Sequence, residues 1–543
     1  VLVAVRSAGA LHRLLDVLPV FQGDHRIITR FTLVPGSDFG IDALAALERS
    51  GARTLPWDDA LRGRHDLILA ASPKGGLHRL SGPRVLLPHG AGFNKTIDDD
   101  GSPDMPSGLD PYYLLVGDEP WADLHALAHE EQVTRLASRS HLAASRSVVV
   151  GDPTLDRLLA SAPQRDVYRD ALGTGSRRLV AVTSTWGPES LLARRPGLAA
   201  ELTGLLPYDE YQVGLILHPN QHSRIGAFDL SRQLAPALDA GLVLAAPHEE
   251  WAALLVAADA VVTDHGSTAL YAAALGTPVV AAYDGGNEVL PGSPMARLLD
   301  STPKLTSAAA LEAALRVASS VDTRAHAAAA FASQGRALAR LRKHLYHLLG
   351  LSPQPGTPDS QAIPLPSSAS RRPLAFAVRA EVTDRHVSVR RFPVHTREPA
   401  HHRAAESPGA GVRHTQSAAV LWRRADSTTV APSGRTVWTA EGWTAQVMEE
   451  SPSCRTAAAI LTRSRVLIRH RSAGLLTARV EPGRSGGRVS YPDPSLVVSA
   501  VHAWLGTRTV VTACASPLVC DTGSVLARVH LDTAHPDDLD YEL

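Results

Sequence analysis

The sequence of 543 residues has few of the features that build metal centres, disulfide frameworks or membrane spans. Its three cysteines, Cys454, Cys514 and Cys520, form no CxxC pair, so neither a zinc site nor a disulfide framework is indicated. No uncharged run reaches about 18 residues, the length that a membrane-spanning helix needs. The first 21 residues carry charges at helical spacing and predict a strand and helix, not a signal peptide. We therefore expect a protein of the reducing cytoplasm.

The chain also lacks net charge and the common nucleotide-hydrolase motif. Lys and Arg total 54, as do Asp and Glu, so no global field attracts nucleic acid, and we expect no nucleic-acid partner. No GxxxxGK[ST] stretch occurs, which sets nucleotide hydrolysis at such a loop aside. We expect no cofactor and no metal, because the carboxylate run at 98–100 is typical of a solvated turn beside Gly101.

Short apolar runs alternate with amphipathic helical stretches over the first 345 residues. This alternation is typical of parallel sheets covered by helices. It predicts two doubly wound, Rossmann-like α/β lobes, at 1–160 and 161–350. The strands that we expect are residues 1–5, 66–72, 84–88, 113–117, 147–151, 178–184, 213–218, 242–246, 260–264 and 278–283.

The composition changes after residue 350. Residues 351–416 are first rich in Pro and Ser and then in Arg and His, and we interpret them as a mostly irregular linker. Short alternating segments in 417–543, including TVWTAEGWTAQVM, predict a small β-rich module. We expect few contacts to cross the linker, so a fragment ending near residue 352 should keep its ligand site.

Four stretches place polar residues just after a predicted strand. In open α/β sheets the ligand crevice lies beyond the carboxyl ends of the strands. The stretches are VLLPHGAGFNKT with His89; VAVTSTWG with Thr183, Ser184 and Thr185; LILHPNQH with His218; and VVTDHGSTALYAAALGTPVV with Asp264, His265, Gly266, Ser267 and Thr268.

The last of these stretches has two interpretations. Asp264 or Ser267 could cap the following helix by accepting hydrogen bonds from its free N–H groups. Alternatively, the helix N-terminus and the adjacent hydroxyls could hold a phosphate or pyrophosphate. The three other stretches have ordinary explanations too, as surface histidines, helix caps or packing residues.

Together these motifs resemble the CDP-glycerol glycerophosphotransferases of teichoic acid synthesis. The resemblance rests on HG near Lys95, GDPTLDRLL at 151–159, TSTW, LHP, and TDHGST with a GTP turn, and it covers about residues 80–290. It implies a glycosyltransferase-B-type fold, which UDP-N-acetylglucosamine 2-epimerases share, and a last helix that packs back on the first lobe. The sequence departs from the family at Tyr271, where a carboxylate is expected.

The resemblance also implies roles for the residues. His89 would be the general base on an acceptor hydroxyl, and His218 would be a second catalytic residue that also binds donor phosphate. Thr183, Ser184, Thr185 and the segment Asp264 to Thr268 would complete the donor site.

The function implied is transfer of a glycosyl or polyol-phosphate group from a CDP- or UDP-linked donor. The acceptor would be a hydroxyl, for example on a membrane-linked polymer of the bacterial cell envelope, and the enzyme would be cytoplasmic or peripheral at the inner membrane face. A nucleotide-sugar 2-epimerase and a non-catalytic nucleotide-binding regulator are the alternatives.

Overall fold

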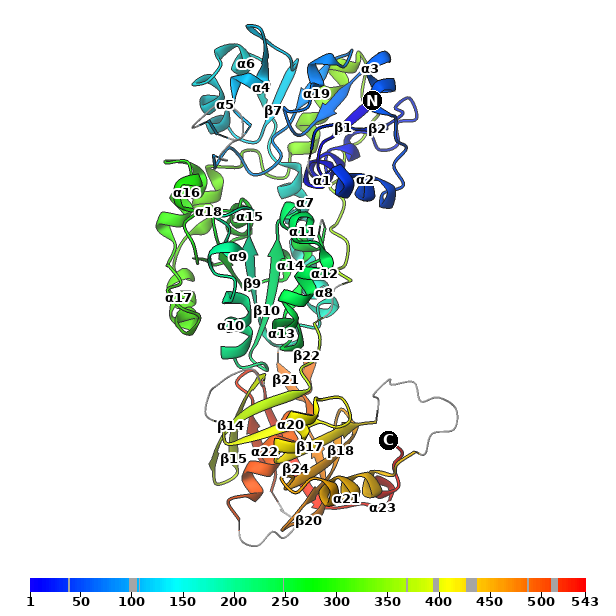
Figure 1. The fold of residues 1–543 in the computed structure, drawn as a ribbon, viewed down its shortest axis with the longest axis vertical. Coiled ribbons are helices and arrows are strands. Elements are labelled where there is room, and N and C mark those ends of the chain that lie inside the picture. The colour runs from blue at the N-terminus through cyan, green and yellow to red at the C-terminus, as the bar shows by residue number, and fades with distance from the viewer. Residues whose placement is uncertain are drawn as a thin grey trace.

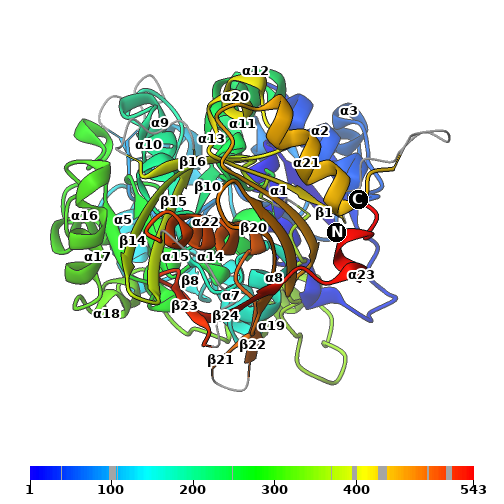
Figure 2. The same cartoon turned by 90° about the horizontal axis from the view of Figure 1, so that it is seen from below.

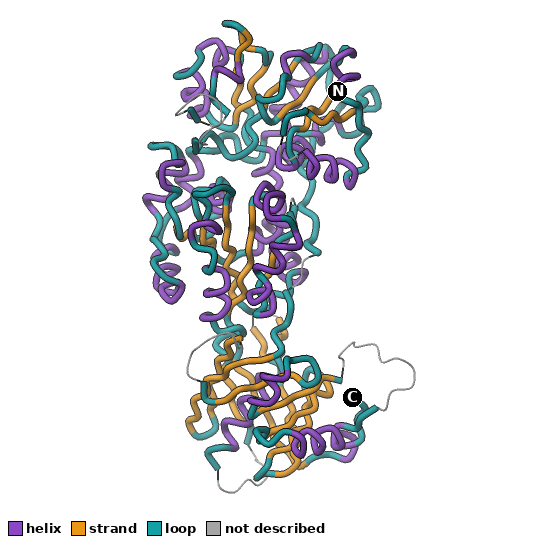
Figure 3. The backbone as a smooth tube through the Cα atoms, viewed as in Figure 1, coloured by secondary structure: helices purple, strands orange, loops and turns teal. Residues whose placement is uncertain are grey.

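The computed structural model describes residues 1–37, 40–96, 105–106, 108–247, 249–367, 370–393, 400–425, 437–485, 488–508 and 516–543. Two α/β lobes and a β-rich body follow one another along the long axis of the molecule (Figure 1). Figure 3 shows helices around the strands of both lobes, and mostly strands in the third body. The predicted pair of Rossmann-like lobes followed by a β-rich module is confirmed.

The first lobe contains a six-stranded sheet in the order β2-β1-β3-β4-β7-β8, and all its strand pairs are parallel. Alternate residues of β1 face opposite sides: Val3 and Val5 belong to one apolar cluster, and Leu2 and Ala4 to another. Both faces are therefore buried under helices, as a parallel sheet requires. The strands are β1 (Leu2–Val5), β2 (Arg30–Leu33), β3 (Ile68–Ala70), β4 (Arg84–Leu86), β7 (Leu124–Leu127) and β8 (Ser147–Val149).

The helices of the first lobe come from two distant parts of the chain. Leu338, Leu341 and Leu345 of α19 (Ala337–Leu349) belong to the same apolar cluster as β1, so the predicted return of this helix to the first lobe is confirmed. The other helices of the lobe are α1 (Ala8–Leu15), α2 (Gly40–Arg49), α3 (Trp57–Arg62), α4 (Pro111–Leu114), α5 (Glu130–Ala137) and α6 (His141–Ser145).

The second lobe contains a five-stranded parallel sheet in the order β11-β10-β9-β12-β13. Its strands are β9 (Arg178–Ser184), β10 (Tyr211–Leu217), β11 (Val243–Leu244), β12 (Ala260–Thr263) and β13 (Val279–Ala281). Its helices are α7 (Pro153–Ser161), α8 (Arg165–Ala171), α9 (Leu191–Arg194), α10 (Leu198–Leu205), α11 (Pro219–Ile225), α12 (Ala227–Gln233), α13 (Ala235–Asp239), α14 (Glu250–Ala257), α15 (Thr268–Leu275), α16 (Pro294–Ser301), α17 (Leu311–Ala318) and α18 (Thr323–Ala328).

The third body is a closed barrel of nine strands in the order β14-β15-β23-β24-β20-β19-β18-β17-β16. Every residue of α22 (Pro494–Leu505) is buried, and its apolar side chains share one cluster with the strands around it. Figure 2 shows α22 lying within the ring of strands. The strands are β14 (Ala375–Thr383), β15 (His386–Pro393), β16 (His402–Glu406), β17 (Val420–Arg424), β18 (Thr456–Thr462), β19 (Arg465–His470), β20 (Gly474–Val480), β23 (Leu518–Asp521) and β24 (Leu526–Thr533).

The prediction of an irregular segment up to residue 416 is wrong. Strands β14, β15 and β16 and helix α20 (Val412–Ser417) lie there, and they form part of the barrel. The Arg-rich composition suggested an exposed, irregular segment. Arg391 is nevertheless buried in β15, because it forms ion pairs with Asp209 and Asp493.

Two other predicted strands are also corrected. TVWTAEGWTAQVM is largely helix α21 (Ala440–Glu450): Ala440, Trp443, Thr444 and Val447 are buried at helical spacing, and Thr439 caps the helix. Residues 113–117 hold the end of α4 and only the two-residue strand β5 (Leu115–Val116), which pairs with β6 (Glu119–Pro120) outside the main sheet.

Contacts across residues 351–373 are numerous, contrary to the prediction. The Tyr168 hydroxyl donates to the carbonyl oxygen of Ile363 at 2.7 Å, and the backbone N–H of Ile363 donates to Ser161. The barrel in turn pairs Arg391 with Asp209 of the second lobe. A fragment ending near residue 352 would therefore lose contacts of both lobe and barrel. No helix in the described ranges has the length and hydropathy of a membrane span.

Candidate functional site

A cleft between the two lobes receives residues from all four predicted stretches. Its volume is about 270 Å³, and it lies where β4, β9, β10 and β12 end. Each of these strands is buried and ends in a polar segment, so the parallel sheets deliver their polar residues to one place. The predicted residues that line it are His89, Thr183, Ser184, Thr185, His218, His265, Gly266, Ser267 and Thr268.

The ring of His218 is fixed so that its Nε2–H group can donate a hydrogen bond into the cleft. It caps α11, and its Nδ1 accepts from the backbone N–H of Asn220 at 3.1 Å. Burial, with the nearby charge of Lys95, lowers the pKa of His218 to about 3, so the ring is neutral. Because Nδ1 accepts, the proton of the neutral ring is assigned to Nε2. Nε2–H can donate to a phosphate oxygen, whereas the ring cannot serve as a base through that atom.

His89 lines the same cleft from the first lobe, as does His12 of α1. His89 follows β4, and the preceding carbonyl, that of Pro88, accepts from Arg13 at 3.1 Å. Desolvation by the walls of the cleft, followed by the charges of Lys95 and Lys74, lowers the pKa of His89 to about 4. The ring is exposed to the cleft and neutral at pH 7, so it can accept a proton.

Asp264 does not face the cleft, which corrects the prediction that it binds donor phosphate. It is completely buried, and its carboxylate accepts from the backbone N–H groups of Gly266, Thr185 and Leu191 at 2.9, 2.9 and 2.8 Å. A carboxylate that binds three N–H groups has little capacity left, and its charge would repel a phosphate. Asp264 instead ties the turn after β12 to the loop after β9.

The N-terminus of α15 has open donors. Ser267 is its N-cap residue, but the Ser267 side chain makes no capping hydrogen bond, and Asp264 bonds to the preceding turn instead. Within the described ranges, the backbone N–H groups of Ser267 and Thr268 have no hydrogen-bond partner. The plain capping interpretation is therefore wrong for this helix, and the donors that an anion needs are present.

His265 lines the cleft, but its ring is engaged in a contact between the lobes. Its side chain is fully buried, and Nε2 lies 2.9 Å from Oε2 of Glu288. Burial raises the pKa of Glu288, but the hydrogen bond to His265 and the charge of Lys95 outweigh it, and the net shift is downward. Lys95 of the first lobe lies 3.3 Å from the same carboxylate. The role of His265 is thus to position Glu288, not to bind phosphate through its ring.

The backbone joins the lobes at the same place. The N–H of Thr96 donates to the carbonyl oxygen of Glu288 at 2.8 Å, and the N–H of Leu290 donates to that of Asn94 at 2.9 Å. Lys95 also lies over the ring of Trp186 at 5.3 Å. The loop that carries Lys95 therefore closes one side of the cleft.

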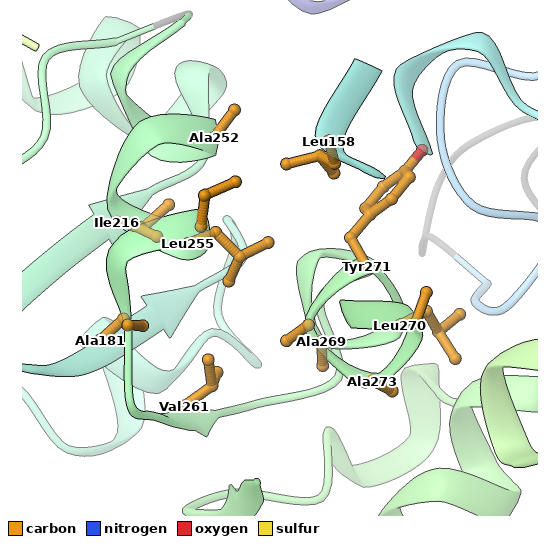
Figure 4. Packing of buried hydrophobic residues seen from close by; sticks show 14 of the residues in the cluster. Leu158, Ala181, Ile216, Ala252, Leu255, Val261, Ala269, Leu270, Tyr271 and Ala273 are labelled. Atoms are coloured by element: carbon orange, nitrogen blue, oxygen red, sulfur yellow. The ribbon is translucent and has the colours of Figure 1, made fainter. Parts of the chain in front are cut away.

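The opposite side is closed by a buried ion pair. Arg13 of α1 binds both carboxylate oxygens of Asp152 at 2.7 and 2.8 Å, and Asp152 also caps α7 through Leu155. The Tyr271 hydroxyl donates to Asp152 at 3.1 Å. Figure 4 shows the Tyr271 ring directed away from α15, with Leu158 to one side of it. Tyr271 therefore has a structural partner where the resemblance led us to expect a carboxylate that binds sugar.

Sequence reasoning missed several residues of the cleft. Glu288, which does not line the cleft but pairs with Lys95 beside it, lies in the loop after strand β13, where the strand-end rule would have found it. Arg13, by contrast, lies in an amphipathic helix, and nothing local distinguishes it from a surface arginine. The other missed residues that line the cleft include Ser7, Asp16, Asn94, Thr154, Arg157, Glu249 and Trp251.

The described residues contain no cluster of three or more His, Cys, Asp or Glu side chains arranged to hold a metal ion. The carboxylate run at 98–100 lies outside the described residues.

No protein-family model matches the chain, and the search of curated proteins gives no match. Among solved structures, the wall teichoic acid polymerase TagF is similar at 14% identity and a TM-score of 0.46, over 64% of this chain and 89% of that chain. The S. aureus MnaA–UDP structure is 14% identical, with a TM-score of 0.41 over 66% and 98% of the two chains. The UDP-GlcNAc 2-epimerase from Neisseria meningitidis, bound to UDP-GlcNAc, is 14% identical, with a TM-score of 0.39 over 64% and 98%. Likenesses this distant carry no inference about substrate or reaction.

Proposed function

We propose that the protein transfers a glycosyl or polyol-phosphate group from a CDP- or UDP-linked donor to a hydroxyl of a cell-envelope polymer. One observation carries the proposal: a neutral histidine of the first lobe, His89, faces the same cleft as an uncapped helix N-terminus of the second. A base on one wall and anion donors on the other are the two groups that such a transfer needs.

The donor phosphates would lie at the N-terminus of α15. Ser267 and Thr268 line the cleft there with backbone N–H groups that have no partner among the described residues, and Nε2–H of His218 adds a donor from the neighbouring strand. These groups are fixed before the ligand arrives, because Asp264 and Asn220 hold the two loops. Fixed donors stabilise developing charge on a leaving phosphate without reorganisation and without a metal ion.

His89 would take the proton of the acceptor hydroxyl as its oxygen attacks the transferred group. In glycosyl transfer the bond from the sugar carbon to the nucleoside diphosphate breaks, and the diphosphate leaves with the bonding pair. In polyol-phosphate transfer the phosphoric anhydride bond breaks instead, and the nucleoside monophosphate leaves. The negative charge of a bound donor would raise the pKa of His89 from about 4 toward the range of an effective base.

A binding protein without turnover is the second candidate, and the low pKa of His89 favours it, since a weakly basic ring is a poor proton acceptor. A 2-epimerase has less support. The cleft carboxylates Asp16 and Glu249 are both paired with Arg157, at 2.9 and 3.2 Å, so neither is free to act on a sugar.

The test is to incubate the full chain with CDP-glycerol and a panel of nucleotide sugars and to measure nucleotide release with and without a hydroxyl acceptor. We expect release from one donor that depends on the acceptor. Binding of a nucleotide with no release under any condition would contradict the transferase and support the regulator. Interconversion of a UDP-sugar with its 2-epimer would establish the epimerase.

The proposed phosphate site at the N-terminus of α15 has a separate test. Ser267→Ala with Thr268→Ala should weaken nucleotide binding about 10-fold or more by calorimetry, since two hydroxyl donors are lost. The melting temperature should hardly change, because neither hydroxyl caps α15.

Ser293→Ala is the matched control. Ser293 caps α16 by accepting from the backbone N–H of Ala296 at 3.1 Å, so its loss should cost about 1 kcal/mol of stability and leave nucleotide affinity unchanged. If the double variant instead lowers only the melting temperature, the hydroxyls do not contact the donor.

A further inference from the structure

A second, larger groove lies between the second lobe and the barrel. Its volume is about 880 Å³, and its walls are residues 173–177 and 208–209 of the lobe and residues 460–463, 489–494 and 522–525 of the barrel. In Figure 1 the ribbon β21 (Gly483–Ser485) and β22 (Arg488–Ser490) lies at this junction. Strand β9 begins here, at Arg178, and ends at the cleft, at Ser184. The groove and the cleft thus lie at opposite ends of one strand, roughly 20 Å apart.

Three arginines of the groove have no carboxylate partner. Within the described ranges, Arg177, Arg372 and Arg463 form no ion pair, although all three line the groove. Arg372 and Arg463 are exposed. Exposed guanidinium groups in a concave wall are suited to phosphate, which they can bind through two parallel N–H groups.

Arg177 is held in place and adds positive charge to the wall of the groove. Its Nε donates to the carbonyl oxygen of Thr174 at 3.1 Å, and its guanidinium lies 4.9 Å from the ring centre of Tyr208. Its Nη2 donates to the carbonyl oxygen of Gly173 at 2.5 Å, and its Nη1 is buried without a hydrogen-bond partner among the described residues. Arg177 therefore contributes its charge to the groove, whereas the exposed Arg372 and Arg463 are the groups that can bind a phosphate directly.

The carboxylates of the groove do not cancel this charge. Asp209 accepts from Arg391 at 2.8 and 2.6 Å, and Asp493 accepts from Arg424 at 2.7 Å. Asp170 alone among the acidic side chains that line the groove is not paired with an arginine in the described ranges. Three unpaired guanidinium groups therefore face one carboxylate.

The groove also offers surface for an uncharged backbone. Tyr491 and Val489 are exposed on its barrel side. A phenol ring can pack against polyol or sugar carbons and donate a hydrogen bond to their hydroxyls.

We propose that this groove binds the phosphodiester groups of an anionic polyol- or sugar-phosphate polymer and so anchors the acceptor away from the reacting end. This inference deepens the proposed function and rests on it for the identity of the polymer. A nucleic acid has less support, because Tyr491 is the one exposed aromatic side chain among the described residues that line the groove, whereas single strands are bound by stacking successive bases on aromatic rings.

The test measures binding directly and needs no turnover. The full chain is titrated with glycerol-phosphate oligomers of defined length, with glycerol 3-phosphate, and with a single-stranded oligonucleotide of equal charge. Arg372→Ala with Arg463→Ala should weaken oligomer binding about 10- to 100-fold, while nucleotide binding at the cleft stays unchanged. Arg316→Ala with Arg413→Ala removes two exposed arginines elsewhere and should have no effect.

Absence of oligomer binding by the unaltered chain would overturn the proposal, as would an equal loss in the control variant. Glycerol 3-phosphate competing at the same concentration as the oligomer would reduce the groove to a small phosphate site. If the oligonucleotide binds as tightly as the glycerol-phosphate oligomers, the groove does not select the proposed polymer, and the proposal is wrong. A further outcome is that the protein binds the oligomer through Arg372 and Arg463 and yet releases no nucleotide from any donor. That result would support the groove as a polymer-binding site and contradict the proposed transferase.

Discussion

Replacing His89 by alanine should lower turnover about 10²- to 10⁴-fold and leave donor affinity nearly unchanged. The loss follows from removing a neutral histidine that the first lobe presents to the donor cleft, while His12 of α1, the other first-lobe histidine that lines it, remains. Steady-state rates and nucleotide calorimetry separate the two effects. His141→Ala changes an exposed histidine of the same lobe and should leave both unchanged.

The pH profile gives a second measure of the same residue. Because the pKa of His89 is lowered to about 4, the ring is neutral and competent above about pH 5. The rate constant kcat/KM, which reports the free enzyme, should therefore fall only as the pH drops through about 4, not through 6.5. Near-normal turnover in His89→Ala, or a profile that the substitution does not alter, would remove His89 from the mechanism.

Arg391→Met should destabilise the protein by roughly 3–5 kcal/mol, because it leaves the carboxylate of Asp209 without its buried partner and leaves Asp493 with Arg424 as its remaining ion-pair partner. The guanidinium is completely buried and joins the barrel to the second lobe. Denaturant unfolding gives the free energy, and calorimetry should show whether lobe and barrel then unfold separately.

The neighbouring Arg390 provides the control. It pairs with Glu210 at 3.1 Å, but its side chain is 57% exposed, so Arg390→Ala should cost less than about 1 kcal/mol. Equal effects of the two substitutions would mean that the buried ion pair does not hold the barrel in place.

The lobes could be predicted from the sequence because their signal is local. Buried runs such as 178–184 are continuous and apolar, and each is followed by a helix, so strand position and order of elements follow directly. The strand-end rule then located the cleft residues of both lobes, including His89 and His218. What it could not separate was a residue that faces the cleft from one that holds the loop beneath it, as Asp264 and His265 do.

The barrel could be predicted only in part. Helix α22 reads as an apolar run rich in valine, since all its faces are buried and helical periodicity is lost. Strand β15 carries a buried arginine whose partners lie elsewhere in the chain, so its polarity suggested irregular structure. In both cases the decisive contact is distant in sequence, and no local pattern reports it.

The return of α19 to the first lobe has a consequence for synthesis on the ribosome. The six strands of that lobe are complete by Val149, but Leu338 and Leu341 of its core are made only after the whole second sheet. At bacterial or eukaryotic translation speeds the delay is roughly 10 to 40 s. During that time Phe21 lacks the ring of Tyr346 on α19, which lies 6.0 Å from its own, and the incomplete apolar cluster of the first lobe is exposed to aggregation.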